Sequence, residues 1–289
     1  MHDTTTIAKW RKTARTRLKP LSAHADREAD LLLEAVLGLS RAQLFTRDTE
    51  VLAAEQLVKL NHQLERLEND EPLAYVLGEQ EFWSLPFLVT PNVLIPRPDT
   101  ELLVETALNH LADSPGSRIL ELGTGSGAIA LALAHSRPLD TIVATDISSR
   151  ALEVARSNQE RLSKSHQRTE NLSFVQSNWY DSLNTEPFDL IVSNPPYIDL
   201  SDPHVTTSVR QYEPESALFS GNDGLEDIEL IIEGAASCLK PGGRILLEHG
   251  WQQHKRVSQC YADNGYVNIT SCRDPAGHDR VTGATREEN

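Results

Sequence analysis

Cysteine and basic side chains are in short supply in this chain of 289 residues. The three cysteines, Cys238, Cys260 and Cys272, are odd in number and form no C-x-x-C pair, which argues against a disulfide framework or a zinc site. Acidic residues outnumber Lys and Arg by 42 to 27, so the formal net charge is −15. A chain of this charge is not held to nucleic acid by bulk electrostatics. We therefore expect reduced thiols, no metal and no direct nucleic-acid partner.

Long apolar runs are missing as well. The longest, "AIALALA" at 128–134, is too short to cross a bilayer, and the first residues, "MHDTTTIAKWRKTART", lack the apolar core of a signal peptide. The basic cluster at 9–19 is interpreted as the solvated face of a helix. These absences predict a cytoplasmic protein with no membrane partner, and we expect it to be a monomer.

The beginning of the chain carries helical periodicity and no strand signal. "DREADLLLEAVLGLS" and "TEVLAAEQLVKLNHQLERLEND" place apolar residues at helical spacing, which predicts a helical domain over 1–75. Alternating apolar residues interrupted by Pro86 and Pro91 then favour a β-hairpin or an extended linker over 76–97. "PRPDTELLVETALNHLA" opens a helix with Asp99 or Thr100 as its N-cap, and we place a catalytic domain over 98–289.

Strand and helix patterns alternate from Arg118 onward. The expected strands are "RILELG", "TIVATD", "LSFVQS", "FDLIVSN", "GRILLEHG" and "YVNITS". Helical patterns such as "ALEVARSNQERLSK" and "GLEDIELIIEGAASCL" lie between them. The alternation predicts an α/β fold with a parallel sheet and helices on both faces.

A glycine-rich turn joins the first of these strands to a helix in "ILELGTGSGAIALALA". Gly123, Gly125 and Gly127 allow a tight turn and close approach to a ligand, although such turns also serve packing. The spacing is neither the dinucleotide pattern nor a phosphate loop. Asp146 ends the next strand, where it is placed to bind a ribose or to cap a helix. Glu121 suits the neighbourhood of a cationic ligand or forms a locally satisfied strand end.

The acidic residue before the glycine turn and the acid ending the second strand together resemble class I S-adenosylmethionine-dependent methyltransferases. That likeness implies a Rossmann-like, mostly parallel sheet of seven strands. "NPPY" at 194–197 resembles the motif of enzymes that methylate planar nitrogens, among them adenine, guanine and glutamine nitrogens.

Further segments, "EFWSLPFLVTPNVLIPRPDTELLVE", "EPESALFSGNDGL", "LKPGGRILLEHGWQQ" and "DPAGHDRVTGA", are similar in order to release factor glutamine methyltransferases. The likeness runs from about Asp26 to Gly283. It implies methyl transfer to the side-chain N5 of the glutamine in the Gly-Gly-Gln motif of class I peptide chain release factors.

The resemblance also implies which residues form the site. S-adenosylmethionine would be held by Gly123, Thr124, Gly125, Ser126, Gly127, Asp146, Trp179 and Asn194. The glutamine would be received by Asn194, Pro195, Pro196 and Tyr197, of which Asn194, Pro195 and Tyr197 are the catalytic candidates. In this scheme Asp146 takes the ribose and Trp179 lies by the adenine, unless Trp179 is ordinary core.

Other positions have roles by the same resemblance. Arg97 and Thr100 stand where related enzymes touch the methionine carboxylate, although Arg97 also fits a surface position. Asn178 occupies a place where the family usually has an acid. Glu213 and Pro214 would border the substrate pocket, after a polar loop, "DLSDPHVTTSVRQY", interpreted as a mobile lid. His249 and His278 form no ligand spacing and are interpreted as structural or exposed.

The motif makes chemical sense for a planar nitrogen, whose delocalised lone pair makes it a poor nucleophile. The Asn194 side-chain oxygen and the Pro195 carbonyl would accept both N–H hydrogens, and Tyr197 would lay its ring against the target. The prolines stiffen the turn. The alternative is a rigid loop that simply follows a buried strand.

Three rival functions stay open at this point. A glutamine methyltransferase of a ribosomal protein would share both motifs, but "LIPRPDTE" favours the release-factor branch. An adenine-N6 DNA methyltransferase would need a basic DNA track, against a net charge of −15. A binding module without chemistry would not need all of the glycines together with Asp146 and Asn194.

Overall fold

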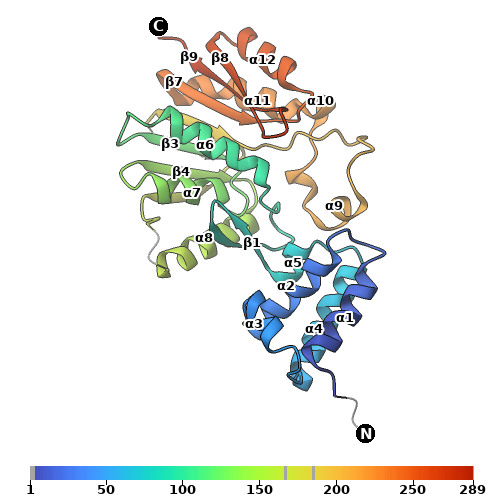
Figure 1. The fold of residues 1–289 in the computed structure, drawn as a ribbon. Coiled ribbons are helices and arrows are strands. Elements are labelled where there is room, and N and C mark those ends of the chain that lie inside the picture. The colour runs from blue at the N-terminus through green and yellow to red at the C-terminus, as the bar shows by residue number, and fades with distance from the viewer. Residues whose placement is uncertain (1–3, 166–167, 184–185, 289) are drawn as a thin grey trace. The chain divides into compact units, whose positions relative to one another are not determined.

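The computed structural model describes residues 4–165, 168–183 and 186–288 (Figure 1). The chain divides into two compact units. The first, here called the helical unit, comprises Met1–Gly78 and Thr206–Tyr212. The second, here called the sheet unit, comprises Glu79–Val205 and Glu213–Asn289. Among the helices that the structure describes, none is long and apolar enough to cross a bilayer.

The helical unit packs all of its helices except the last, Thr207–Tyr212, around a single apolar core. Its helices are α1 (Ile7–Leu18), α2 (Ala25–Leu37), α3 (Arg41–Thr46), α4 (Ala54–Glu68), α5 (Leu73–Leu77) and α9 (Thr207–Tyr212). Ser40 caps α3 by accepting from the backbone of Gln43 at 3.3 Å, and the Gln43 side chain accepts from the Ser40 N–H at 2.9 Å. Trp10 and Leu64 meet in the buried core, as the helical spacing of the sequence indicates.

α9 comes from the segment that the sequence presents as a mobile lid. The Ser208 hydroxyl donates to the Asp70 carbonyl at 2.6 Å, and the Tyr212 hydroxyl donates to the Asn69 carbonyl at 2.8 Å. The interpretation as an unpacked lid is therefore wrong for this part, because these residues form a helix that packs within the helical unit. The polar composition of this segment gave no sign of the packing, because its contacts with the rest of the helical unit are hydrogen bonds from hydroxyl groups.

The sheet unit contains the predicted α/β architecture. A sheet of seven strands has the order β5-β4-β3-β6-β7-β9-β8. Its strands are β3 (Arg118–Leu122), β4 (Thr141–Asp146), β5 (Leu172–Gln176), β6 (Phe188–Ser193), β7 (Leu239–Glu248), β8 (Tyr266–Arg273) and β9 (Asp279–Arg286). β3 pairs in parallel with β4 and β6, and β9 is antiparallel to both neighbours. The mostly parallel sheet is confirmed; the sequence patterns alone did not identify β9.

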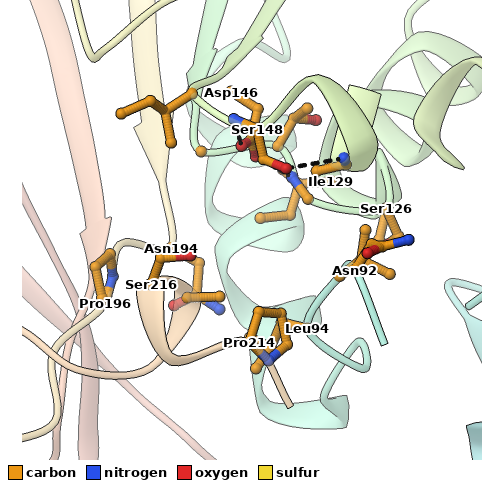
Figure 2. Close-up of a pocket in the computed structure, with 18 of the residues that line it drawn as sticks. Asn92, Leu94, Ser126, Ile129, Asp146, Ser148, Asn194, Pro196, Pro214 and Ser216 are labelled. Carbon is orange, nitrogen blue, oxygen red and sulfur yellow. Dashed lines mark hydrogen bonds between the residues drawn. The ribbon is translucent and has the colours of Figure 1, made fainter. Parts of the chain in front are cut away.

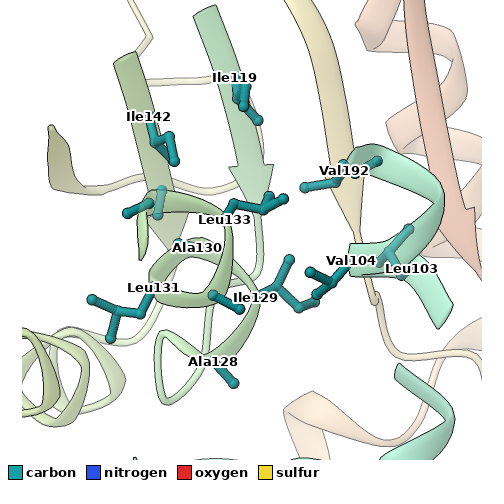
Figure 3. Close-up of a cluster of buried hydrophobic side chains, with 14 of the residues drawn as sticks. Leu103, Val104, Ile119, Ala128, Ile129, Ala130, Leu131, Leu133, Ile142 and Val192 are labelled. Atoms are coloured by element: carbon teal, nitrogen blue, oxygen red, sulfur yellow. The ribbon is translucent and has the colours of Figure 1, made fainter. Parts of the chain in front are cut away.

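Helices cover both faces of this sheet, as expected. The helical elements of the sheet unit are η1 (Pro98–Thr100), α6 (Glu101–His110), α7 (Ala128–Ser136), α8 (Ser149–Lys164), η2 (Glu215–Ala217), α10 (Gly221–Gly224), α11 (Glu226–Cys238) and α12 (His254–Asp263). On one face, Val104 of α6 and Ile129 of α7 pack against Ile119 and Val192 of the sheet (Figure 3). On the other face, α11 and α12 bury a second cluster that includes Ile231 and Tyr261.

A small hairpin precedes the sheet, with strands β1 (Glu79–Phe82) and β2 (Leu85–Leu88). Trp83 and Ser84 form its two-residue turn with φ of 54° and 59°, the left-handed pair that a tight hairpin turn requires. Asn158 of α8 binds Leu88 through both side-chain ends, accepting at 2.7 Å and donating at 3.0 Å. The same amide donates to the Ser126 carbonyl at 2.9 Å, so one buried side chain joins the hairpin to the glycine turn.

Candidate active site

A cavity of about 540 Å³ opens within the sheet unit, at the carboxyl ends of β3, β4 and β6. This is the edge at which open α/β sheets bind ligands. Figure 2 shows residues of its wall. Many of the residues predicted for the site line this cavity. They are Arg97, Thr100, Glu121, Gly123, Thr124, Gly125, Ser126, Asp146, Asn178, Trp179, Asn194, Pro196 and Pro214. One cavity thus brings together segments that lie nearly 120 residues apart in the sequence, from Arg97 to Pro214.

The glycine turn has a backbone that few other residues adopt. Gly123, Gly125 and Gly127 have φ of 72°, 54° and 82°. At Gly127 a Cβ would also lie 3.2 Å from the Ala155 Cβ of α8, so packing and conformation both require glycine. α7 begins directly after Gly127, and the turn therefore carries the first amides of a helix beside the cavity.

Asp146 at the end of β4 holds this turn in place. One carboxylate oxygen accepts the Gly125 N–H at 2.8 Å and the other accepts the Ser148 N–H at 2.9 Å (Figure 2). The N-cap of α8 is Ser148, so the alternative that Asp146 caps the helix is excluded. Each carboxylate oxygen keeps further acceptor capacity for a ligand in the cavity. Burial raises the pKa of Asp146, and its two backbone hydrogen bonds oppose that effect.

Glu121 at the end of β3 is a buried acid with one unused oxygen. Only 1% of the residue is exposed. The Thr124 hydroxyl donates to Oε2 at 2.6 Å, whereas Oε1 has no partner of ordinary hydrogen-bond geometry in the described chain. Burial raises the pKa of Glu121 to about 8. A cation in the cavity would satisfy this carboxylate, so the residues present fit a positively charged ligand.

The "NPPY" turn after β6 is fixed at both ends. The Asn194 amide nitrogen donates to Thr100 Oγ1 at 3.1 Å, and Asn194 and Pro196 line the cavity. The Tyr197 ring does not line it; the ring packs on the second apolar cluster and its hydroxyl donates to Glu248 at 3.2 Å. The Tyr197 carbonyl accepts from the Gln253 side chain at 2.9 Å. The Tyr197 ring is not among the described residues that line this cavity, so the cavity wall gives no support to its expected contact with a target.

Arg97 and Thr100 reach the cavity with their polar groups already engaged. The Arg97 guanidinium pairs with Glu213, whose buried carboxylate also accepts the Ile95 N–H at 3.2 Å. Thr100 is the N-cap residue of α6, one of the two positions predicted, although its side chain makes no capping hydrogen bond. Its hydroxyl oxygen serves Asn194 instead. Pro214 lines the cavity, while Glu213 acts behind it through Arg97.

Trp179 and Asn178 both border the cavity. Trp179 packs against the second apolar cluster and also lies over the glycine turn, 3.6 Å from where a Cβ on Gly123 would be. Core packing and a place beside the glycine turn are therefore compatible. The Asn178 amide donates to Asp181 at 3.2 Å, which orients it at the rim.

The two histidines that we interpreted as structural or exposed, His249 and His278, both contact neighbouring side chains. His249 is buried, with its ring nitrogens 2.9 Å from the Gly250 carbonyl and 2.7 Å from the Thr282 hydroxyl. Burial lowers the pKa of His249. The centroid of the His278 ring lies 5.0 Å from that of Trp251, with the two ring planes tilted by 37°. The part of the chain that the structure describes holds no group of three or more His, Cys, Asp or Glu suited to a metal ion.

Sequence reasoning missed three polar residues that support the site: Asn158, Gln253 and Glu248. Asn158 and Glu248 each stand among apolar residues of a helix or a strand, at positions that become buried. A polar residue on a buried face is a usable signal, because such a group needs a partner. The identity of each partner depended on the fold.

The sheet order, glycine turn and strand-end acid define the class I methyltransferase fold. A crystal structure of a methyltransferase from Pyrococcus furiosus has the same fold as this chain, with a TM-score of 0.54. The likeness covers 78% of this chain and 98% of that one, and at 22% sequence identity it concerns the fold only. A family model described as the methyltransferase small domain matches residues 98–211, and one described as the PrmC N-terminal domain matches residues 9–78.

Sequence relatives define the family more closely. A protein of Salmonella typhimurium named release factor glutamine methyltransferase is 45% identical over 89% of this chain and 90% of its own length. A protein of Escherichia coli with the same name is 43% identical over 94% of this chain and 96% of its own length. The chain belongs to the family of release factor glutamine methyltransferases.

Proposed function

We propose that this protein transfers a methyl group from S-adenosyl-L-methionine to the N5 of the glutamine in the Gly-Gly-Gln motif of class I release factors. The products are N5-methylglutamine and S-adenosylhomocysteine. The relatives' names support the substrate. The observation that carries the chemistry is that Asn194, a side-chain acceptor for an amide, lines the same cavity as the glycine turn, Asp146 and Glu121.

The cofactor would lie along the glycine turn. Asp146 would accept the ribose hydroxyls, Trp179 would contact the adenine, and Glu121 would face the positive charge of the methionine end. Glycines 123–127 would let the backbone approach that end, with Thr124 and Ser126 between them. When bound, S-adenosylmethionine supplies an electrophilic methyl group on a sulfonium sulfur.

The substrate amide would be aimed by the "NPPY" turn. The Asn194 side-chain oxygen and the Pro195 carbonyl would accept the two N–H hydrogens, and Pro196 would wall the cavity. The N–C bond would form as the methyl–sulfur bond breaks. These acceptors would stabilise the positive charge that develops on the nitrogen, until one N–H proton passes to water. We assign Tyr197 to holding the turn through Glu248, rather than to stacking on the glutamine.

We also propose that the helical unit docks the release factor, since the described residues that line the cavity all belong to the sheet unit. A truncated chain beginning at Glu79 should bind cofactor, yet it should methylate a whole release factor less well than a short Gly-Gly-Gln peptide. The intact chain on both substrates is the control. Equal losses on peptide and protein would contradict docking. Because α9 packs on Asn69 and Asp70, a second truncated chain should also replace 206–212 with a short linker.

The reaction is expected to take place in the cytoplasm and on a monomeric enzyme, since the described residues that line the cavity all belong to one sheet unit. Neither nucleic acid nor a membrane is expected as a direct partner, in line with the net charge of −15.

The direct test of the function uses radiolabelled S-adenosylmethionine with three acceptors side by side. Purified release factor should take up label at its Gly-Gly-Gln glutamine, whereas ribosomal proteins and DNA should not. Replacing that glutamine by alanine in the release factor is the matched control. Label on ribosomal protein or DNA, with none on release factor, would contradict the proposed function.

A further inference from the structure

We propose that Gln253 is a positioning residue that orients the acceptors of the "NPPY" turn toward the substrate amide. The inference rests on the proposed function. Gln253 is not among the described residues that line the cavity, so it acts through the peptide group between Tyr197 and Ile198, which it contacts.

The two prolines of the turn make it stiff but hard to anchor. Pro195 and Pro196 have no N–H, so neither residue can hold the turn by donating a backbone hydrogen bond. Their rings fix φ, which leaves rotation about ψ as the main freedom of the turn. The direction of the Pro195 carbonyl, a proposed acceptor for the substrate amide, therefore depends on how the two ends of the turn are held.

The far end of the turn is held at a single peptide group, the one between Tyr197 and Ile198. Its carbonyl accepts from Gln253 Nε2 at 2.9 Å, and its N–H donates to the Leu218 carbonyl at 3.0 Å. The near end is held by the Asn194 side chain, whose amide nitrogen donates to a hydroxyl group at 3.1 Å. A peptide group that is bonded on both sides cannot rotate without losing a hydrogen bond, so this contact limits how the turn can rotate.

The Gln253 side chain is itself oriented by hydrogen bonds. Its Oε1 accepts the Gly250 N–H at 2.8 Å, so its NH2 faces the other way. Three backbone carbonyls converge on that nitrogen, Tyr197 at 2.9 Å, Asp223 at 3.2 Å and Gly224 at 3.3 Å. Carbonyl oxygens only accept, so a donor is needed to bring three of them together. Gln253 thus joins the end of the turn to a neighbouring loop.

The loop that carries two of these carbonyls has an uncommon backbone. Asn222, Asp223 and Gly224 follow one another with φ of 53°, 56° and 80°. Such conformations are costly for residues other than glycine and cluster at functional sites. A Cβ on Gly224 would lie 2.2 Å from the Tyr197 carbonyl oxygen, so the loop backbone packs directly against the end of the turn. The loop and Gln253 therefore contact the same carbonyl.

Exchanging the donor for an acceptor tests the role of Gln253. Gln253→Glu keeps the shape and an oxygen for the Gly250 N–H, but the Tyr197 carbonyl loses its donor and faces a carboxylate. Single-turnover methyl transfer to release factor at saturating S-adenosylmethionine should slow roughly tenfold, while cofactor affinity changes less than about twofold. The matched control is Gln252→Glu, the same change at the exposed neighbour, which should keep the wild-type rate.

A pair of glycine variants tests the contact without a change of charge. Gly224→Ala places a methyl group against the Tyr197 carbonyl and should slow the transfer roughly tenfold or more. Gly265 has nearly the same φ, 77°, but nothing lies within 4 Å of where its Cβ would be. Gly265→Ala therefore carries similar backbone strain without the contact. It should lose stability and keep the rate within about twofold of wild type.

A double-mutant cycle with Asn194→Ala separates positioning from general destabilisation. Asn194→Ala removes one acceptor and releases the near end of the turn, so Gln253 has less orientation to maintain. Gln253→Glu should then slow the transfer by about threefold or less, instead of tenfold. The control is Tyr266→Phe, which removes a buried hydrogen bond to the Ile232 carbonyl away from the cavity and should change the rate little on either background.

Cofactor binding and thermal unfolding are measured in parallel for every variant. A wild-type rate in Gln253→Glu, or an equal slowing on both backgrounds, would overturn the positioning role. Gly265→Ala slowing the transfer as much as Gly224→Ala would also overturn it. If Gln253→Glu or Gly224→Ala does not fold, the other one and its control decide. A wild type that transfers no methyl to release factor would instead contradict the proposed function.

Discussion

The two units of this protein bury carboxylates in opposite ways. In the helical unit, Asp30 is fully buried and is surrounded by Arg11 at 3.2 Å, Arg15 at 3.1 Å and Arg41 at 3.5 Å. In the sheet unit, the buried acids Glu121 and Glu248 take hydroxyl groups as hydrogen-bond partners. Burial raises the pKa of these two acids, to about 8 and about 7.

This difference distinguishes a buried acid that serves the fold, Asp30, from a buried acid that we expect to serve a ligand, Glu121. Asp30 has its counter-charges built into the same unit, so nothing from outside is needed to neutralise it. Glu121 keeps an unpaired oxygen beside a cavity, and its compensation is expected from a ligand. Buried acids of the first kind should affect stability, while acids and amides of the second kind should affect binding and rate.

Removing the acid of the helical unit should have the largest effect. Asp30→Ala leaves Arg11 buried without its partner and should lower the free energy of unfolding by about 3–5 kcal/mol, measured by chemical denaturation. Cofactor affinity at a temperature where the variant stays folded should be unchanged. The matched control is Asp26→Ala, which breaks the exposed pair with Arg15 at 3.2 Å and should cost less than about 1 kcal/mol. A large loss of cofactor affinity in Asp30→Ala would break the comparison.

Asn194→Ala should have the next largest effect, and on rate instead of stability. It removes an acceptor for the substrate amide and should cost about 2–4 kcal/mol of transition-state stabilisation, roughly 10²–10³ in rate. Asn194→Asp keeps an oxygen there and should fall between wild type and alanine. Single-turnover methyl transfer at saturating cofactor measures both. If Asn194→Ala keeps the wild-type rate, or fails only by losing cofactor, the turn does not orient the amide.

Local sequence patterns were sufficient to predict the elements that are determined by their own residues. β4 was expected and found at Thr141–Asp146, because a short apolar run with β-branched residues, bounded by polar residues, favours a buried strand. The glycine turn and the position of Asp146 at the end of β4 could also be predicted from the sequence, since few backbone conformations suit those residues. β9 was missed: "DRVTGATR" alternates weakly, and it becomes a strand by pairing with β7 and β8 on both sides.

The contacts of the site that sequence reasoning did not predict depend on partners that are distant in the sequence. Tyr197 donates to Glu248, and the Thr100 hydroxyl accepts from Asn194, and these contacts join residues 51 and 94 positions apart. The spacing of residues within a local motif does not predict pairs that are this far apart in the sequence. The motif thus identified the chemistry, while the fold decided which side chains face the cavity.

Asp146→Ala should sharpen the comparison through its effect on cofactor binding. Loss of a charged hydrogen-bonding group should weaken S-adenosylmethionine affinity by about 1–3 kcal/mol, measured by calorimetry. Part of this loss would come from the glycine turn, because Asp146 also holds the Gly125 N–H. Ser148→Ala removes the α8 cap in the wall of the same cavity and keeps the backbone N–H that Asp146 accepts, so it should cost stability and leave affinity nearly unchanged. Unchanged affinity in Asp146→Ala would exclude the ribose role.

The smallest expected effect tests the unpaired acid directly. Burial raises the pKa of Glu121 from an ordinary value of 4.5 to about 8, so near pH 7 the free protein holds this proton. A cationic ligand favours the charged form, so binding should release the proton. Affinity should then rise with pH between 6.5 and 7.5, by at most about tenfold or 1.4 kcal/mol.

Calorimetry in buffers of different ionisation enthalpy should detect the released proton, and Glu121→Gln should abolish it. Stability gives an independent reading. Because the folded pKa of Glu121 lies above its ordinary value, the folded protein binds more protons than the unfolded chain between pH 4.5 and about 8. The free energy of unfolding without cofactor should therefore fall as pH rises across that window, more steeply in wild type than in Glu121→Gln. Identical slopes and no proton release would place Glu121 with Asp30, as a buried acid that serves only the fold.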